Sequence, residues 1–286
     1  MIKNSINKIV SFVQLLTDSS PKIYWWSLTT DNGTHKENFG DFLNPYIVEK
    51  LTGKKPILFY PKSKFSFFFK HALMIGSVIN KSNSNSIVWG SGIISKNDKI
   101  KGGKFIAVRG PRTALRLKEL CFKSPNVYGD PALLLPLIYE EKKEKIYKIG
   151  VIPHFLDFEE LNALNYNKSE VLFIDLLNSD VEFVINQILT CEKIVSTSLH
   201  GLVVAHAYQV PAMWWKYSKL NGDDVKFYDY FESVLINVER DYQGFSFNEI
   251  IKVNDYCVPK TDIINKIQID LLSVFPYKLV KKFKRN

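Results

Sequence analysis

The chain has 286 residues, of which 46% are hydrophobic and 23% are charged, so it carries enough length and apolar material for two ordinary domains. Its formal net charge is +9, but the aromatic residues fall in apolar runs rather than among basic clusters, which argues against a nucleic-acid partner. The three cysteines, Cys121, Cys191 and Cys257, lack the spacing of a disulfide framework or a zinc site and favour a reducing compartment.

Both ends of the chain are basic. Residues 1–19 are predicted to form a basic amphipathic helix, and the last ten residues hold five lysine or arginine side chains and no acid. Such ends favour contact with an anionic membrane surface, and a solvated tail is the alternative. The apolar run over 9–16 is shorter than the ~20 residues of a bilayer span, and no signal-peptide cleavage site follows it. We therefore expect a cytoplasmic chain, with peripheral attachment to the inner face of the cytoplasmic membrane left open.

From about residue 21 to residue 215, short apolar runs alternate with helix-like segments, a pattern typical of parallel α/β sheets. The predicted strands are Ile23–Trp26, Ile57–Tyr60, Ala72–Ile75, Ile87–Trp89, Phe105–Val108, Ile146–Ile152, Val171–Ile174, Ile194–Ser196 and Val210–Trp214. Helix starts are predicted at Asn44-Pro45, at Pro111, at Asp130-Pro131 and at the capping-box pattern Ser179–Glu182. The first of these helices should end at Gly53, and a final amphipathic helix over 262–275 should pack back across the domains.

A polar run over 140–145 interrupts the apolar periodicity and marks the predicted domain boundary. We expect the N-terminal helix over 1–19, one α/β domain over 20–141, a second over 146–258, and a C-terminal helix with a basic tail over 259–286.

The segment Ser196–Gly201 is the most informative part of the chain, because it joins a predicted buried strand to an apolar helix. Its hydroxyl residues suit an N-cap, and a helix start presents backbone N–H groups at a positive end that binds anions. His200 lies in the first turn and could move a proton near neutral pH. A capped core helix with a structural histidine is the alternative interpretation.

Open α/β sheets bind ligands at the carboxyl ends of their strands, and further polar segments follow the predicted strands. The loop Gly90-Ser91-Gly92 exposes backbone, Arg109 and Arg112 flank a helix start, and His154 follows another strand. Arginine forks match carboxylate and phosphate oxygens, so these segments together favour a small, doubly anionic ligand. Asp130 is interpreted as an N-cap, His71 and His206 as structural, and His35 is left unassigned.

These segments resemble the polysaccharide pyruvyl transferases, and they occur in that family's order over about residues 24–232. The matching pieces are Asn38–Asp41, Trp89–Gly92, Val108–Thr113, Gly129–Leu134, Val151–His154 and Ser196–Gly201, closed by Val210-Pro211. The resemblance implies an α/β, GT-B-like fold with two Rossmann-like domains, parallel sheets and the active site in the interdomain cleft.

The family transfers the pyruvyl group of phosphoenolpyruvate onto two hydroxyls of a sugar as a cyclic ketal. The resemblance therefore implies work on a precursor of a cell-surface polysaccharide, such as an exopolysaccharide or a capsule. It also implies His200 as general acid or proton shuttle, and His154 or Asp41 as the base on the acceptor. The substrate-binding residues that it implies are Arg109, Arg112, Gly90, Ser91, Asn38, Ser198 and Leu199. The reaction needs no metal, and phosphoenolpyruvate is a substrate rather than a cofactor.

The acceptor that the family and the basic ends imply is a galactose- or mannose-type glycan on a polyprenyl-diphosphate lipid. Trp25, Trp214, Trp215, Tyr217 and the cluster over 227–231 could stack on sugar rings or pack in a core. Many members of the family carry arginine where this chain has Ser198, so Arg109 or Arg112 would have to compensate. Two alternatives stay open: a GT-B glycosyltransferase that uses a sugar nucleotide, and a non-catalytic saccharide-binding member of the family.

Overall fold

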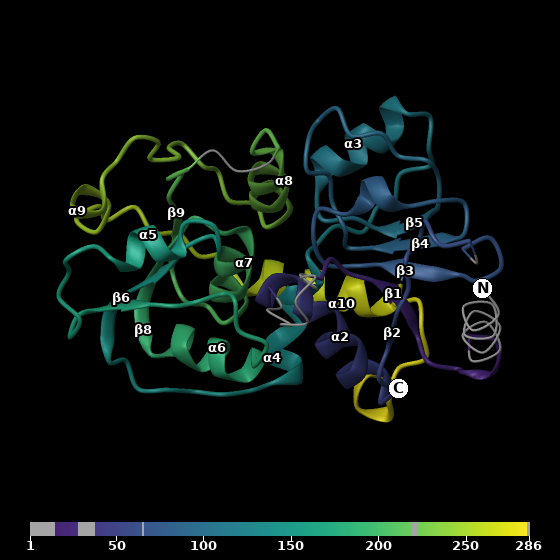
Figure 1. The fold of residues 1–286 in the computed structure, drawn as a ribbon, viewed down its shortest axis with the longest axis horizontal. Coiled ribbons are helices and arrows are strands. Elements are labelled where there is room, and N and C mark those ends of the chain that lie inside the picture. Colours follow the sequence, from purple (N-terminus) through teal and green to yellow (C-terminus); the bar gives the residue numbers. More distant parts are fainter. Residues whose placement is uncertain (1–14, 28–37, 65, 219–221, 285–286) are drawn as a thin grey trace, which may run out of the picture.

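Two parallel sheets lie side by side, each with helices packed against it (Figure 1). The structure is a computed structural model that describes residues 15–27, 38–64, 66–218 and 222–284. The strand order is β2-β1-β3-β4-β5 in the first sheet and β7-β6-β8-β9 in the second. Every strand pair in the two sheets is parallel, which confirms the α/β prediction. The GT-B-like arrangement and the domain limits stay predictions, and the predicted helix over 1–19 lies largely outside the described residues.

All nine predicted strands are present, each within a few residues of its predicted position. They are β1 (Lys22–Tyr24), β2 (Ile57–Leu58), β3 (His71–Leu73), β4 (Ser86–Trp89), β5 (Lys104–Ala107), β6 (Tyr147–Ile152), β7 (Val171–Phe173), β8 (Cys191–Ser196) and β9 (Ala212–Trp214). The helices are α2 (Phe39–Thr52), α3 (Pro111–Glu119), α4 (Leu135–Ile138), α5 (Phe158–Asn162), α6 (Val181–Leu189), α7 (Leu199–Ala207), α8 (Val225–Ser233), α9 (Phe247–Ile250) and α10 (Thr261–Ser273). The described residues also form the 3₁₀ turns η1 (Ile79–Lys81), η2 (Pro131–Leu134) and η3 (Lys281–Phe283).

The start of α2 corrects the prediction that a helix begins at Pro45. The helix begins at Phe39, because the side chain of Asn38 caps it by accepting a hydrogen bond from the backbone N–H of Gly40 at 3.0 Å. Gly53 ends the helix as predicted, in the left-handed conformation with a φ of 70°.

Pro45 is tolerated inside α2 because a side chain replaces the hydrogen bond that proline cannot donate. The amide of Asn44 donates to the carbonyl of Asp41 at 3.0 Å. The same side chain accepts from the N–H of Ile75 at 2.9 Å, which ties α2 to the chain after β3. These bonds hold the N-terminal half of α2 against the first sheet.

Two other helix starts agree with the sequence, and one differs. Helix α3 begins at Pro111, and Asp130 caps η2 by accepting from the N–H of Ala132 at 3.0 Å. Helix α6 is capped by Asp180, one residue after the predicted cap Ser179, and the side chain of Asp180 accepts from the N–H of Phe183 at 3.0 Å.

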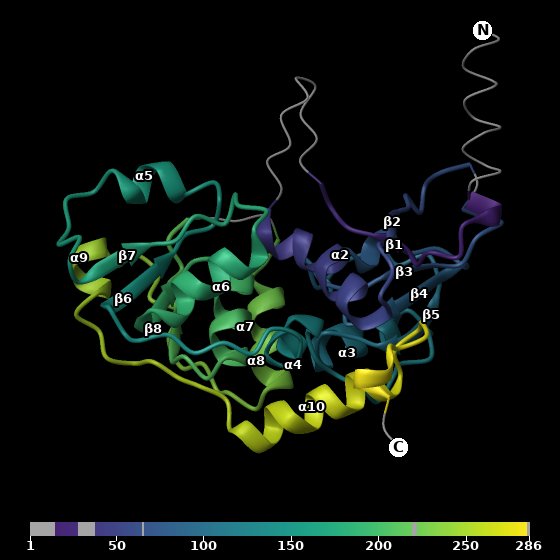
Figure 2. The same ribbon diagram turned by 90° about the horizontal axis from the view of Figure 1, so that it is seen from below.

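Helix α10 confirms the predicted final helix and runs from the second sheet to the first (Figure 2). The indole N–H of Trp89 donates to the carbonyl of Leu271 at 2.9 Å, and the amide of Gln268 donates to Leu133 O at 2.8 Å. One hydrophobic core includes residues of both sheets, such as Ile23 and Ile194. Helix α10 and this shared core therefore hold the two sheets together.

Candidate active site

A cavity of about 430 Å³ lies between the two sheets. Its wall comes from the segments that follow the carboxyl ends of β1, β3, β6 and β8, and from the first turns of α2 and α8. This is the edge where open α/β sheets bind ligands. Six of the ten predicted site residues line it, namely Asn38, Asp41, His154, Ser198, Leu199 and His200.

The turn between β8 and α7 is held by the hydroxyl groups in front of the helix. Ser196 Oγ accepts from the N–H of Ser198 at 3.0 Å, and Thr197 Oγ1 accepts from the N–H of His154 at 2.6 Å. Ser198 occupies the N-cap position, but its side chain makes no capping bond. In the part of the chain that the structure describes, no acceptor bonds the N–H groups of Leu199 and His200. These donors are therefore available to an anion in the cavity.

His200 packs against the first turn of α2. A Cβ on Gly40 would overlap its imidazole ring, so the glycine is what allows the ring to lie there. The Nε2 atom is buried, and no described residue forms a hydrogen bond with it. Burial, followed by the charge of Arg109, lowers the pKa of His200 to about 3. The imidazole is therefore neutral at pH 7 and would have to take up a proton before it could act as the predicted general acid.

His154 reaches the same cavity from the end of β6. Burial and the charge of Lys226 lower its pKa to about 4, so it is also neutral at pH 7. Its Nδ1 accepts from the backbone N–H of Leu156 at 3.3 Å, which leaves Nε2 as the nitrogen that can exchange a proton.

Lys226 is a cavity residue that sequence reasoning missed. It lies in the first turn of α8, and burial together with the charge of Arg109 lowers its pKa to about 8. No carboxylate among the described residues forms an ion pair with it. Nothing in the local sequence marks this lysine, because its helix is placed only by tertiary packing. Ser77, also missed, follows a predicted strand and could have been found by the strand-end rule.

Arg109 lies behind the cavity wall instead of lining it. Its side chain is fully buried, and its Nε donates to the carboxylate of Asp229 at 3.2 Å. Its other nitrogens donate to Ser77 Oγ at 2.7 Å and to Ile93 O at 2.6 Å. Among the described residues that line the cavity, Ser77 is the one that Arg109 bonds, and a direct contact of Arg109 with substrate stays a prediction.

The other three predicted residues also lie away from the cavity lining. Arg112 forms a surface ion pair with Glu232 at 2.7 Å. Gly90 has a φ of +94° and is packed against Pro131, and Ser91 donates to Gly76 O at 2.8 Å. The glycine loop thus lies behind the cavity wall, where its small residues leave room for Pro131 and Arg109.

Most of the aromatic residues proposed for sugar stacking are core residues. Trp25, Trp214 and Trp215 are buried, and Trp214 stacks on Phe227 with centroids 4.3 Å apart. His71 and His206 are buried and hydrogen-bonded, as predicted for structural histidines. Aromatic faces at the cavity come from Trp26 and Phe155, whose centroids lie 6.2 Å apart.

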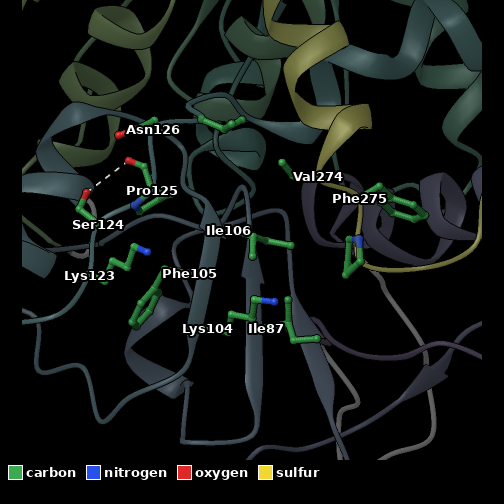
Figure 3. Close-up of a pocket in the computed structure, with 12 residues that line it drawn as sticks. Ile87, Lys104, Phe105, Ile106, Lys123, Ser124, Pro125, Asn126, Val274 and Phe275 are labelled. Carbon is green, nitrogen blue, oxygen red and sulfur yellow. Dashed lines mark hydrogen bonds between the residues drawn. The ribbon is translucent and has the colours of Figure 1, made fainter. Parts of the chain in front are cut away.

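A second cavity, of about 570 Å³, lies beside β4 and β5 and the chain after α10 (Figure 3). Its lining is mostly apolar, and its charged residues are Lys104 and Lys123. It contains no histidine or carboxylate that could transfer a proton. Within the described ranges, no group of three His, Cys, Asp or Glu side chains is placed to hold a metal ion. Of these two cavities, the one between the sheets is the one lined by histidine and carboxylate side chains.

The chain is similar to one protein family and to a viral protein. The family model for polysaccharide pyruvyl transferases matches residues 35–219, a range that contains His154 and His200 but stops before Lys226. An uncharacterized protein of Acanthamoeba polyphaga mimivirus, L143, is 32% identical over 253 residues, which cover 82% of this chain and 86% of the viral protein. No solved structure matches the chain significantly.

Proposed function

Because the chain belongs to the polysaccharide pyruvyl transferase family, we propose that it transfers the pyruvyl group of phosphoenolpyruvate onto two sugar hydroxyls as a cyclic ketal. The observation that carries the proposal is the buried, unpartnered Nε2 of His200 in a cavity that also contains a cation and a helix N-terminus. This set matches a donor with two anionic groups whose conversion requires proton transfer.

The donor anions would be held by two elements on the cavity wall. The backbone N–H groups of Leu199 and His200 would bind one anion, and Lys226 would bind the other. Arg109 would act from behind the wall, through Ser77 and through the positive potential that already lowers the pKa of His200 and Lys226. Lys226 thereby takes the role in donor binding that Arg109 or Arg112 was predicted to fill. That role compensates for Ser198, where many family members carry arginine.

The protons of the reaction balance without an acid from solvent. One sugar hydroxyl forms a C–O bond to C2 of the donor, and its proton ends on C3, which becomes the methyl group. The second hydroxyl displaces phosphate from C2, and its proton leaves with the phosphate. A neutral imidazole suits this relay, because it takes a proton from one oxygen and returns it to carbon or phosphate. His200 would carry this transfer, with His154 or Asp41 as the base on the acceptor.

The acceptor would be a galactose- or mannose-type glycan on a polyprenyl-diphosphate lipid, in a pathway to a cell-surface polysaccharide. Trp26 and Phe155 would provide apolar faces for its sugar ring. None of the described helices combines the length and the apolar character that crossing a bilayer requires. We propose that the chain works in the cytoplasm, at the inner face of the membrane, with no metal or cofactor.

The test incubates the protein with phosphoenolpyruvate and soluble galactosides or mannosides, and follows phosphate release and the mass of the glycoside. Pyruvyl transfer predicts phosphate release that depends on the glycoside, and a product heavier by one pyruvate less one water. Phosphate release without a heavier glycoside, or thermal stabilisation by a sugar nucleotide alone, would overturn the proposal.

A further inference from the structure

The segment around β2 and β3 carries an unusual concentration of positive charge. Residues 50–97 contain eight lysines and no aspartate or glutamate. Three of these lysines, Lys62, Lys64 and Lys70, are exposed on the connection between β2 and β3. We define this connection, residues 59–64 and 66–70, as the aromatic loop. Its surface has no acid of its own, so it is complementary to an anionic partner.

The aromatic loop also exposes large apolar side chains. Phe67 and Phe68 are 75% and 72% exposed, and Tyr60 is 53% exposed. Phe69, the next residue, points the other way and packs on Phe59 with centroids 6.1 Å apart. Adjacent exposed phenylalanines are costly in water and usually mark a surface that binds an apolar partner.

The exposure of these rings is fixed by hydrogen bonds to the loop backbone. The side-chain amide of Asn85 donates to the carbonyls of Phe67 and Ser66 at 2.6 and 3.1 Å. The amide of Asn83 donates to Pro61 O at 2.8 Å. Turning the loop to bury the two phenylalanines would break these bonds, so the display belongs to the folded state.

We propose that the aromatic loop docks the protein on an anionic lipid bilayer. The phenylalanines would enter the interfacial region while the flanking lysines contact lipid phosphates, a combination suited to a bilayer surface. The loop adjoins the cavity, because the ring of Tyr60 contacts Tyr24, a cavity residue, with centroids 5.9 Å apart. Docking would therefore hold the cavity near a lipid-linked acceptor, a consequence that rests on the proposed function.

The test is co-sedimentation of the full chain with vesicles of phosphatidylcholine, with and without phosphatidylglycerol. We expect binding only to the anionic vesicles, and at least about tenfold weaker binding for Phe67→Ser/Phe68→Ser and for Lys62→Glu/Lys64→Glu. The matched controls are Phe183→Ser, which removes a ring that is 48% exposed on α6, and Lys252→Glu/Lys260→Glu. These controls should bind like the wild type.

Equal vesicle binding by the loop variants and the wild type would overturn the proposal. So would a loss of self-association in Phe67→Ser/Phe68→Ser measured by light scattering, since the loop would then be a contact between copies of the chain. Turnover of a soluble glycoside separates the two proposals. If the loop variants lose vesicle binding but keep this turnover, docking is supported, whereas an inactive wild type that binds vesicles contradicts only the proposed reaction.

Discussion

The start of α7 and the start of α3 each follow a parallel strand, but only the polar side chain at the start of α7 lines the cavity between the sheets. Each follows a parallel strand, β8 or β5, and each places a chemically capable side chain at the helix start. His200 faces the cavity, whereas Arg109 is fully buried behind it. The difference lies in the partners that the rest of the fold supplies. Asp229 on α8 meets the guanidinium, while no described residue reaches His200 Nε2.

The burial of Arg109 gives it a structural role in this fold. The Arg109–Asp229 pair also fixes Thr113, whose backbone N–H and hydroxyl both donate to the same carboxylate. Gly92 lies against the guanidinium and leaves room for it. A residue at the carboxyl end of a strand thus lies at the ligand-binding edge. Its side chain can still point into the core when a carboxylate from a distant helix pairs with its charge there.

The largest effect is expected for His200→Gln. If the imidazole moves the reaction's protons, kcat should fall about 10²- to 10⁴-fold, because glutamine cannot accept and return a proton at neutral pH. The circular dichroism spectrum and the melting temperature should remain those of the wild type. Turnover near the wild-type rate in a folded variant would remove His200 from the chemistry.

Gly40→Ala should nearly match that loss without touching an ionisable group. The added methyl overlaps the imidazole of His200 and must displace it, and a shift of about 1 Å at a reacting group costs about 10²-fold in rate. The control is Gly150→Ala in β6, where an added Cβ would also come within 3.0 Å of side-chain atoms, those of Ile194 and Cys191. It should lower the melting temperature but leave kcat of the folded protein unchanged, and equal kcat losses in both variants would contradict the assignment.

Lys226 should give the donor affinity a pH dependence. With its pKa lowered to about 8, the amine is charged below that pH and neutral above it. We expect kcat/KM for the donor to fall above about pH 8 in the wild type. Lys226→Arg should keep its charge and flatten that limb, whereas Lys226→Met should raise the donor KM about tenfold or more at every pH. An unchanged alkaline limb in Lys226→Arg would show that another group titrates there.

Arg109→Ala should act on stability more than on donor affinity. It leaves Asp229 as a buried, unpaired charge, which costs about 3–5 kcal/mol in the free energy of unfolding measured by denaturant titration. The double variant Arg109→Met/Asp229→Leu should recover part of that loss, because it removes the unpaired charge but leaves the N–H and hydroxyl of Thr113 without their acceptor. A raised donor KM with unchanged stability would instead show that Arg109 contacts the donor substrate.

Arg112→Ala should have the smallest effect. Its ion pair with Glu232 is about 40% exposed on both sides, so the free energy of unfolding should change by less than about 1 kcal/mol. The donor KM should equal that of the wild type, and Glu232→Gln serves as the matched control. A KM increase confined to Arg112→Ala would restore its predicted role in binding.

The sequence alone predicted the nine strands and their α/β class, because alternating apolar runs and helix signals are local properties. It also brought together Asn38, Asp41, His154 and His200, because each follows a strand or begins a helix at the same edge. It missed the start of α2, since the proline at position 45 looked like a first-turn residue and the compensating amide of Asn44 is visible only in the fold.

Only the tertiary structure decided which charges face the cavity. Lys226 reaches it because α8 packs against α3, and Arg109 leaves it because Asp229, 120 residues later, neutralises it inside the core. Burial and counter-charge are long-range properties, and no spacing in the sequence encodes them. The sequence thus determined the strands and most of the polar side chains at the cavity edge. The packing of α8 determined that Lys226 lines the cavity and that Arg109 is buried behind it.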